Sequence, residues 1–325
     1  MENLVNFVIA FIVSFYSTSL IVPFMRFVAL KLAIIDKRDP RKLHRKVITR
    51  IGGLAIYIGF IYATAAVLFT TNLTPIDKMY FHKLSVIFIA STMILFLGLY
   101  DDIMGAKPYQ KIMVQLFAAV ILIRNDLFVA YLSNPFGNEA AFVGIWGIPI
   151  TLLWVVGLTN AINLIDGVDG LAGSIVFICS IGLFVKFIIS DMFIPGIISI
   201  SLAGACLGFL RYNTPPAKIH MGDTGSMFLG FLLAAFSLQT SHKSATAVTL
   251  MVPLLMLLIP ISDTILAVFR RLLRGQHPFI ADKHHLHHWL LSKDLSYMQV
   301  VLILCGTTFI LNVLVIVSSF LKLVK

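Results

Sequence analysis

Polar residues of the types that act on phosphates follow several apolar stretches, and the first such group is LYDDIMGAKPYQK. It places Asp101 and Asp102 directly after an apolar stretch, with Lys107 and Lys111 shortly behind them. Adjacent carboxylates repel each other and favour a nearby cation, which is either a divalent ion such as Mg²⁺ or a lysine. Taken alone, the pair is explained as well by a solvated helix end with balanced charges.

The second group, NAINLIDGVDGLAGS, is more specific. Asn160, Asn163 and Asp166 recur every three residues, and Asp169 follows. On a helix this spacing puts the first three side chains on one face. The glycines among them allow a ligand or a second helix to approach the backbone closely: Gly167, Gly170 and Gly173. Helix packing through small residues and interhelical amide hydrogen bonds explains the glycines, but not two asparagines and two aspartates together.

The third group, RYNTPPAKIHMGDTGSMFLG, joins a helix end to a helix start. Pro215 and Pro216 break the chain, and GDTGS begins the next apolar stretch. Asp223, Thr224 and Ser226 are residue types that cap helix N-termini, which is the structural interpretation. A helix N-terminus with glycines is also a site for anions, where Asp223 would hold a divalent cation that bridges to phosphate.

The fourth group, GQHPFIADKHHLHHWLL, contains four histidines within five residues: His284, His285, His287 and His288. Zinc is a competing interpretation. No cysteine is near them in the sequence, and adjacent histidines on a helix point in different directions. A basic cluster that hydrogen-bonds an anionic substrate is therefore favoured. Asp263, in the preceding apolar stretch, is expected to face a cavity or a partner, because an acid within the membrane is costly.

The most basic stretch is DKRDPRKLHRKVITRIGG. Contact with lipid headgroups and membrane topology account for most of its charge. Lys46 and Arg50 come just before the glycine pair Gly52 and Gly53, and we expect these two side chains to reach inward to the substrate.

The elements that position these groups are membrane helices. Of 325 residues, 59% are hydrophobic and 12% are charged, and the mean hydropathy is +0.95. A soluble domain carries about twice this charged fraction. We therefore expect an all-α integral membrane protein that forms a single polytopic domain over residues 1–325. About ten segments approach the ~20 residues that cross a bilayer: 4–29, 51–71, 84–100, 112–131, 148–164, 171–190, 194–212, 226–243, 246–269 and 299–321.

The charges indicate how this domain lies in the membrane. Eighteen of the 25 lysines and arginines fall in or beside the odd-numbered loops, which places those loops in the cytoplasm and both termini outside. Orientation does not require acids, yet ten aspartates share these loops, which indicates an active site at the cytoplasmic face: Asp36, Asp39, Asp101, Asp102, Asp166, Asp169, Asp223, Asp263, Asp282 and Asp294. The outer segment 133–150 is expected to form a small hairpin.

Two other classes of function were weighed. A net charge of +10 suggests nucleic acid, but the basic residues flank lipid-length segments, so membrane lipid is the expected partner and nucleic acid is not. A membrane transporter fits the many helices and the intramembrane acid. Transporters bind their substrates near the bilayer midplane, whereas the polar groups here collect at one surface.

Four of these motifs occur in an order that is typical of one enzyme family: LYDD, NxxNxxDGxDGLAGS, MGDTGS and DKHHLHH. Over residues 40–290 the chain resembles the polyprenyl-phosphate N-acetylhexosamine-1-phosphate transferases. Asp282 and Lys283 before HLHH look like the WecA/TagO branch, which uses UDP-N-acetylglucosamine (UDP-GlcNAc) and undecaprenyl phosphate. The alternative within the family is the phospho-N-acetylmuramoyl-pentapeptide transferase branch of peptidoglycan synthesis. That branch carries three consecutive histidines, and here Leu286 interrupts the run.

The resemblance implies a Mg²⁺-dependent enzyme that transfers N-acetylglucosamine 1-phosphate from UDP-GlcNAc to undecaprenyl phosphate and releases UMP. This would be the first membrane step in the synthesis of a cell-envelope polysaccharide of the teichoic acid or O-antigen type. The expected location is the bacterial plasma membrane, and a homodimer is compatible with the resemblance.

The resemblance also implies roles for individual residues. Asp223 and Asn163 would hold Mg²⁺, for which Mn²⁺ would substitute. The catalytic residues would be Asp101 and Asp102, which serve the lipid phosphate, and Lys111, which serves the phosphates. Residues 166–170 would lie near the uridine, and the histidines would face the sugar phosphate. The full substrate-binding set is Lys46, Arg50, Asn160, Asp166, Gly167, Asp169, His285, His287 and His288. The sequence VITR at 47–50 departs from the PIPR that is frequent in the family.

Overall fold

The computed structural model describes residues 2–35, 48–71, 75–133, 140–239, 257–262, 265–266, 286–293 and 295–323. Most of these residues are helical, which confirms the predicted all-α class. The helices are α1 (Glu2–Lys31), α2 (Gly52–Thr70), α3 (Pro75–Met104), α4 (Pro108–Arg124), α5 (Gly147–Ile165), α6 (Leu171–Ile189), α7 (Phe193–Asn213), α8 (Gly222–Gln239), α11 (Leu286–Leu291) and α12 (Tyr297–Leu323). A short 3-10 helix, Gly144–Trp146, precedes α5.

Seven of the described helices are long and apolar enough to cross a membrane: α1, α2, α3, α5, α6, α7 and α12. The shorter helices α4, with 17 residues, and α8, with 18 residues, pack among them. The predicted segment 246–269 lies for the most part outside the described residues. The other nine predicted segments each coincide with one of these helices.

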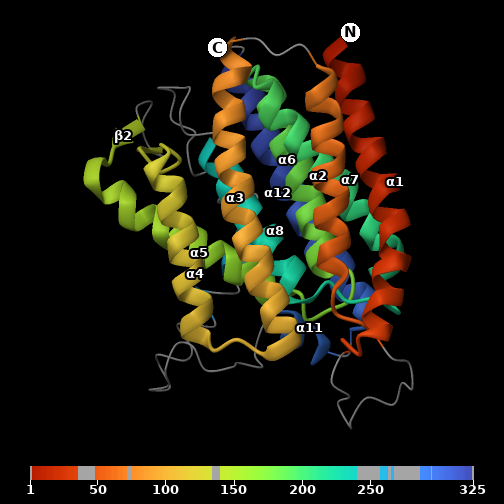
Figure 1. The fold of residues 1–325 in the computed structure, drawn as a ribbon. Coiled ribbons are helices and arrows are strands. Elements are labelled where there is room, and N and C mark those ends of the chain that lie inside the picture. The colour runs from red at the N-terminus through yellow and green to blue at the C-terminus, as the bar shows by residue number, and fades with distance from the viewer. Residues whose placement is uncertain are drawn as a thin grey trace.

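The helices form one bundle with its connections at two ends (Figure 1). Both termini lie at one end, and α11 and the turn between α3 and α4 lie at the other. The second end carries the connections 105–107, 166–170 and 214–221, and we call it the motif end. The predicted motifs on these connections therefore share one end of the bundle.

Helix α8 runs through the centre of the bundle. Every residue from Thr224 to Gln239 is buried, and α8 packs against α2, α3, α5, α6 and α7. A helix that is apolar on all sides is surrounded either by lipid or by other helices, and here the other helices surround it. The start of α8 is therefore a fixed point around which the motif end is built.

Three predicted boundaries were wrong. The segment predicted at 84–100 forms the longer helix α3 over residues 75–104. The segment predicted at 112–131 forms α4 over residues 108–124, because Pro108 suits the first helical position and the Gln110 side chain accepts the Lys107 N–H (2.8 Å). The chain leaves the helix near Asp126, whose φ is +59°. The hairpin predicted at 133–150 lies earlier, where β1 (Tyr131–Ser133) pairs antiparallel with β2 (Ala140–Phe142).

Candidate active site

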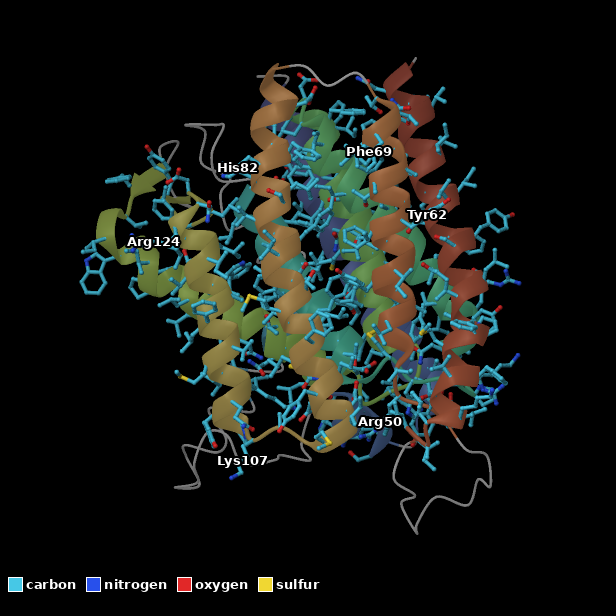
Figure 2. All side chains as sticks on the ribbon, viewed as in Figure 1. Arg50, Tyr62, Phe69, His82, Lys107 and Arg124 are labelled. Carbon is cyan, nitrogen blue, oxygen red and sulfur yellow. The ribbon has the colours of Figure 1, made fainter. Side chains whose placement is uncertain are left out.

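The ends of α3, α4 and α5 meet the start of α8 at the motif end. Each helix contributes a charged or amide side chain that was predicted from the sequence, among them Asp101 from α3, Lys111 from α4, Asn163 from α5 and Asp223 from α8. Figure 2 shows Arg50 and Lys107 at the same end of the bundle, with Phe69 towards the other. Three of the four predicted motifs thus contribute to one site.

Lys111 links two carboxylates that are far apart in the sequence. Its Nζ lies 2.7 Å from Asp101 Oδ2 and 2.6 Å from Asp223 Oδ2. The other oxygen of Asp101 accepts the Ala106 N–H (2.6 Å). Charge-assisted hydrogen bonds of this length are the strong ones in proteins. The Lys111 ammonium therefore lies between two carboxylates at the point where α3, α4 and α8 converge.

Asp102, the neighbour of Asp101, has a different environment. Its Oδ1 accepts the Asp223 N–H (3.0 Å), and its Oδ2 accepts the Thr224 N–H (2.9 Å) and the Thr224 hydroxyl (2.6 Å). The first N–H groups of a helix have no partner within the helix. Asp102, which lies on α3, therefore caps the N-terminus of α8 and fixes the backbone of Asp223.

This capping role predicts how substitutions at Asp102 differ. Asp102→Asn is expected to retain more activity than Asp102→Ala, because its amide oxygen still accepts an N–H bond from α8. Loss of a cap costs about 0.5–2 kcal/mol, so the alanine variant should also unfold at a lower temperature. Transferase assays and thermal unfolding of both variants measure this. An asparagine variant as inactive as the alanine variant, but with unchanged unfolding, would contradict the capping role.

Glycines bring the backbones of α2 and α3 against α8. A methyl group on Gly98 would overlap the carbonyl oxygen of Asp223 and lie 2.5 Å from Thr224 Cα. A methyl group on Gly53 would overlap the backbone of Gly225. The sequence analysis noted the pair Gly52 and Gly53, and the structure shows that Gly53 is needed for this close approach.

The asparagines of α5 lie in its last two turns, which confirms the predicted helical spacing. Asn163 Nδ2–H donates to Ser226 Oγ (2.9 Å), and the Asn163 amide lies beside the Asp223 carboxylate. Asn160, one turn earlier, is hydrogen-bonded to Gln115 of α4. Asn163 is therefore next to the acid with which it was predicted to act, whereas Asn160 contacts a neighbouring helix.

Asp166 follows the last residue of α5 and is half-buried. Burial raises the pKa of its carboxyl well above the usual value, and the nearby carboxylates of Asp223 and Asp102 raise the pKa further. Arg50 opposes this rise with its positive charge. Three carboxylates, those of Asp223, Asp102 and Asp169, and one cation, Arg50, thus act on Asp166, so acids outnumber bases among these neighbours.

The loop after α5 is tied to the loop after α7. Asp169 Oδ1 lies 3.3 Å from His220 Nε2, and Asp169 Oδ2 accepts the Ala217 N–H (3.1 Å). Asn213 Oδ1 accepts the Gly170 N–H (3.0 Å), at a glycine whose φ of +77° suits its lack of a side chain. These contacts join the two motif loops into one unit. Gly167, which lies between Asp166 and Asp169 in the sequence, is exposed.

The end of the first loop joins the same unit. His220 N–H donates to the carbonyl of Thr49 (2.8 Å), and the carbonyl of His220 accepts the Gly52 N–H (3.1 Å). Arg50 stands between these two contacts and is half-buried. Lys46, Asp263 and His285 lie outside the described residues, and so do the side chains of His287 and His288, whose backbone belongs to α11.

Three residues of this region were not predicted from the sequence: Gln115, Asn213 and His220. Gln115 had a detectable signal, because it follows Lys111 by four residues in an apolar helix and therefore shares its face. Asn213 and His220 had no such signal. Their partners lie on another loop, and only the packing of α5 against α8 and of α6 against α7 brings the loops together.

The oxygen donors of the site fit Mg²⁺, which is held in proteins by one or two carboxylates together with water and substrate phosphates. Asp223 supplies carboxylate oxygens, and the Asn163 side chain beside it carries an amide oxygen. Among the described residues, no group of three His, Cys, Asp or Glu side chains is placed to hold a metal ion by itself. Water and substrate phosphates would complete the coordination of an ion held by Asp223 and Asn163.

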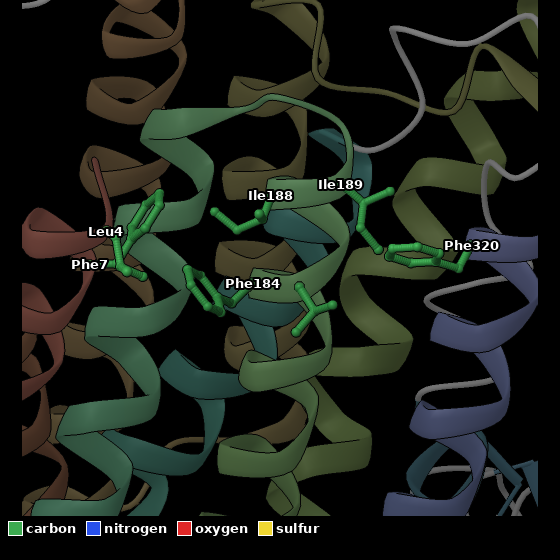
Figure 3. Close-up of a pocket in the computed structure, with 7 residues that line it drawn as sticks. Leu4, Phe7, Phe184, Ile188, Ile189 and Phe320 are labelled. Atoms are coloured by element: carbon green, nitrogen blue, oxygen red, sulfur yellow. The ribbon is translucent and has the colours of Figure 1, made fainter. Parts of the chain in front are cut away.

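A cavity at the opposite end of the bundle offers no comparable chemistry. It has a volume of about 420 Å³ and lies between α1, α6 and α12. Figure 3 shows apolar side chains around it, among them Phe7, Phe184 and Phe320. All its lining residues are hydrophobic, so the motif end remains the candidate active site.

Comparisons with known proteins identify the family of this chain. Residues 84–241 match the family described as glycosyl transferase family 4, and this range contains Asp101, Lys111, Asn163 and Asp223. The chain is 36% identical over 316 residues to the probable undecaprenyl-phosphate N-acetylglucosaminyl 1-phosphate transferase of Bacillus subtilis (strain 168). That alignment covers 97% of this chain and 86% of the relative.

Two further relatives have related names. The decaprenyl-phosphate N-acetylglucosaminephosphotransferase of Mycolicibacterium smegmatis is 32% identical, with 91% of this chain and 77% of the relative covered. The undecaprenyl-phosphate alpha-N-acetylglucosaminyl 1-phosphate transferase of Escherichia coli (strain K12) is 27% identical, with 88% and 76% covered. Because the similarity to the Bacillus relative extends over nearly the whole chain, the protein belongs to the family of polyprenyl-phosphate N-acetylglucosamine-1-phosphate transferases.

Proposed function

We propose that the protein transfers N-acetylglucosamine 1-phosphate from UDP-GlcNAc to undecaprenyl phosphate and releases UMP. The observation that carries this proposal is the contact of Lys111 with Asp101 and Asp223 at the common end of α3, α4 and α8. The names of the relatives support the same sugar and the same class of lipid acceptor. The product would begin a cell-envelope polysaccharide of the teichoic acid or O-antigen type.

The reaction forms a bond between a lipid phosphate oxygen and the phosphorus that bears the sugar. It breaks the bond between that phosphorus and the bridging oxygen of UMP. One phosphoanhydride replaces another, so the equilibrium should lie near unity. The main barrier is electrostatic because both reactants are anions, and the ammonium of Lys111 would reduce their repulsion.

The acids of the site would have separate roles. A phosphate monoester has a second pKa of about 6, so the lipid phosphate is largely dianionic at pH 7 and needs no strong general base. Asp101 would orient the lipid phosphate together with Lys111, to which it is bonded. Asp102 would act through α8 by fixing Asp223.

Asp223 and Asn163 would hold Mg²⁺, or Mn²⁺ in its place. The bound ion would neutralise phosphate charge that Lys111 alone cannot balance. The excess of acids over bases near Asp166 supports this assignment, because it leaves negative charge for a cation to offset.

The motif end would lie at the cytoplasmic surface of the plasma membrane, with both termini outside. The surplus of lysines and arginines in the odd-numbered loops supports this orientation. Removing the lipid tail from the bilayer costs ~0.8 kcal/mol per CH₂, so the lipid phosphate must be met at the membrane surface. UDP-GlcNAc, which is water-soluble, would reach the same place from the cytoplasm.

A UMP-release assay on the purified protein tests the proposed function. A panel of UDP-sugars is supplied with and without undecaprenyl phosphate. UMP should appear only with UDP-GlcNAc and only when the lipid phosphate is present. Release with UDP-N-acetylmuramoyl-pentapeptide instead would assign the other branch of the family. Lipid-independent uptake of UDP-sugar into proteoliposomes would favour a transporter.

Removal of divalent metal is expected to abolish UMP release. Excess EDTA should stop the reaction, and either Mg²⁺ or Mn²⁺ added above the chelator should restore it, because Lys111 alone cannot balance the phosphates. The same assay with zinc measures the selectivity of the site. Unchanged turnover in EDTA would contradict a metal role for Asp223 and Asn163.

A further inference from the structure

An amide pair joins α4 to α5 one helical turn away from the reacting groups. Asn160 Nδ2–H donates to Gln115 Oε1 (2.7 Å), and Gln115 Nε2–H donates back to Asn160 Oδ1 (3.4 Å). Gln115 Nε2 also lies 3.7 Å from Met227 Sδ of α8. Gln115 is fully buried. The contact therefore holds three helices together at one level of the bundle.

Each residue of this contact lies one helical turn from a residue of the candidate active site. Gln115 follows Lys111 by four residues, and Met227 follows Asp223 by four residues. Asn160 precedes Asn163 by three residues. Side chains three or four positions apart lie on the same face of a helix, and four residues span about 6 Å. The amide pair thus lies directly behind the groups that meet at the motif end.

Among the described residues, α4 packs on α3 and α5 and buries few of its side chains completely. Its buried residues are Gln115, Ala118, Ala119 and Leu122, whereas Met113 and Phe117 are exposed. In a bilayer, apolar side chains gain little by leaving lipid for another helix, so hydrogen bonds and close packing decide how helices associate. Small alanines permit sliding and rotation. Directional bonds from a buried amide restrict both.

We propose that Gln115 and Asn160 are positioning residues for the reaction. Their amide pair sets the depth and rotation of α4, so that the Lys111 ammonium stands between Asp101 and Asp223. This inference rests on the proposed transferase function, in which Lys111 acts on phosphate. Asn160 then serves the reaction through α4, in place of the substrate contact that the family resemblance implies.

The test compares four variants by the kcat and KM of UMP release and by thermal unfolding. They are Gln115→Leu, Asn160→Leu, the double leucine variant, and an exchange variant that combines Gln115→Asn with Asn160→Gln. Each single leucine variant should lower kcat at least about tenfold, because small misplacement of a reacting group is costly. The KM for UDP-GlcNAc should change by less than about twofold, and the double variant should be no worse than either single variant.

The exchange variant separates positioning from substrate contact. It keeps both amides and their combined side-chain length, so it should recover at least about half of the wild-type kcat. A folded exchange variant without recovery would overturn the proposal, as would a large rise in KM confined to Asn160→Leu. If the leucine variants do not fold, the exchange variant still gives this answer.

A matched control is Gln239→Leu at the other end of α8. Gln239 is also buried, and its Nε2 has no hydrogen-bond partner in the part of the chain that the structure describes. This variant should keep full activity. If the wild-type protein released no UMP, the proposed function would fail. In that case the unfolding temperatures still test the amide pair. If the effects of the two leucine substitutions are additive, Gln115 and Asn160 are not coupled and the positioning proposal is overturned.

Discussion

Replacement of Asp223 by asparagine is expected to abolish turnover while the protein stays folded. The carboxylate accepts a 2.6 Å hydrogen bond from Lys111 and would bind the divalent ion, so its loss removes two electrostatic contributions together. Loss of even one preorganised charge contact commonly costs 10²–10³-fold in kcat. We therefore expect at least about a 10³-fold loss of UMP release, measured with labelled UDP-GlcNAc.

The matched control is Asp191→Asn. Asp191 is an exposed aspartate between α6 and α7, at the end of the bundle away from the motif loops. Its φ is +52°, which asparagine tolerates well. This variant should be as active as the wild type. Substantial turnover by a folded Asp223→Asn variant would remove Asp223 from both the metal site and the contact with Lys111.

Gly98→Ala is expected to have the second-largest effect, although Gly98 has no side chain with which to bind a substrate. The added methyl group would overlap the Asp223 carbonyl and lie 2.5 Å from Thr224 Cα, so α3 and α8 would have to separate. A displacement of about 1 Å at a reacting group can cost 10²-fold. We expect a loss of that order in kcat and a lower unfolding temperature.

Gly157→Ala provides the control for this substitution. Gly157 also lies in a membrane helix, α5, but among the described residues no atom outside the adjoining turns of α5 lies within 4 Å of where its methyl group would be. Alanine favours helix over glycine by about 1 kcal/mol, so Gly157→Ala should be neutral or slightly stabilising. Equal activity of the two alanine variants would show that the close contact of α3 with α8 is dispensable.

The sequence predicted the acids of the site because they occupy helix ends. Apolar length and charge placed Asp101, Lys111 and Asp223 at ends of helices on one side of the membrane, and the structure brings these three side chains into contact. These side chains meet because successive helices run antiparallel, which brings every second connection to the same end of the bundle. Local spacing also predicted the shared face of Asn160 and Asn163 correctly.

The sequence did not predict which acid does which task. Asp101 and Asp102 are adjacent, and their types give no reason to separate them. The difference arises from the directions of the two side chains, because successive residues of a helix point about 100° apart. One carboxylate faces α4 and the other faces the start of α8. The partner of Asp102 is 121 residues away in the sequence, so no local pattern could reveal it.

The end of α4 was misplaced for a related reason. Residues 125–131 contain Leu127, Phe128 and Val129, and hydropathy alone cannot distinguish them from another turn of helix. Leu127 and Val129 are buried, and the Val129 N–H binds the hydroxyl of Thr151 (2.9 Å). A contact with another segment therefore replaces the helical hydrogen bonds, and the chain turns towards β1.

The burial of α8 on every side has a consequence for how the bilayer acts on this protein. Lipids of different chain length would change the tilt of the outer helices α1 and α12, which expose residues such as Leu20 and Leu302. Asp223 stands on a helix that no acyl chain touches along the buried stretch from Thr224 to Gln239. The outer helices would thus adjust to changes in membrane thickness by tilting. The reacting groups would keep their spacing in membranes of varied composition.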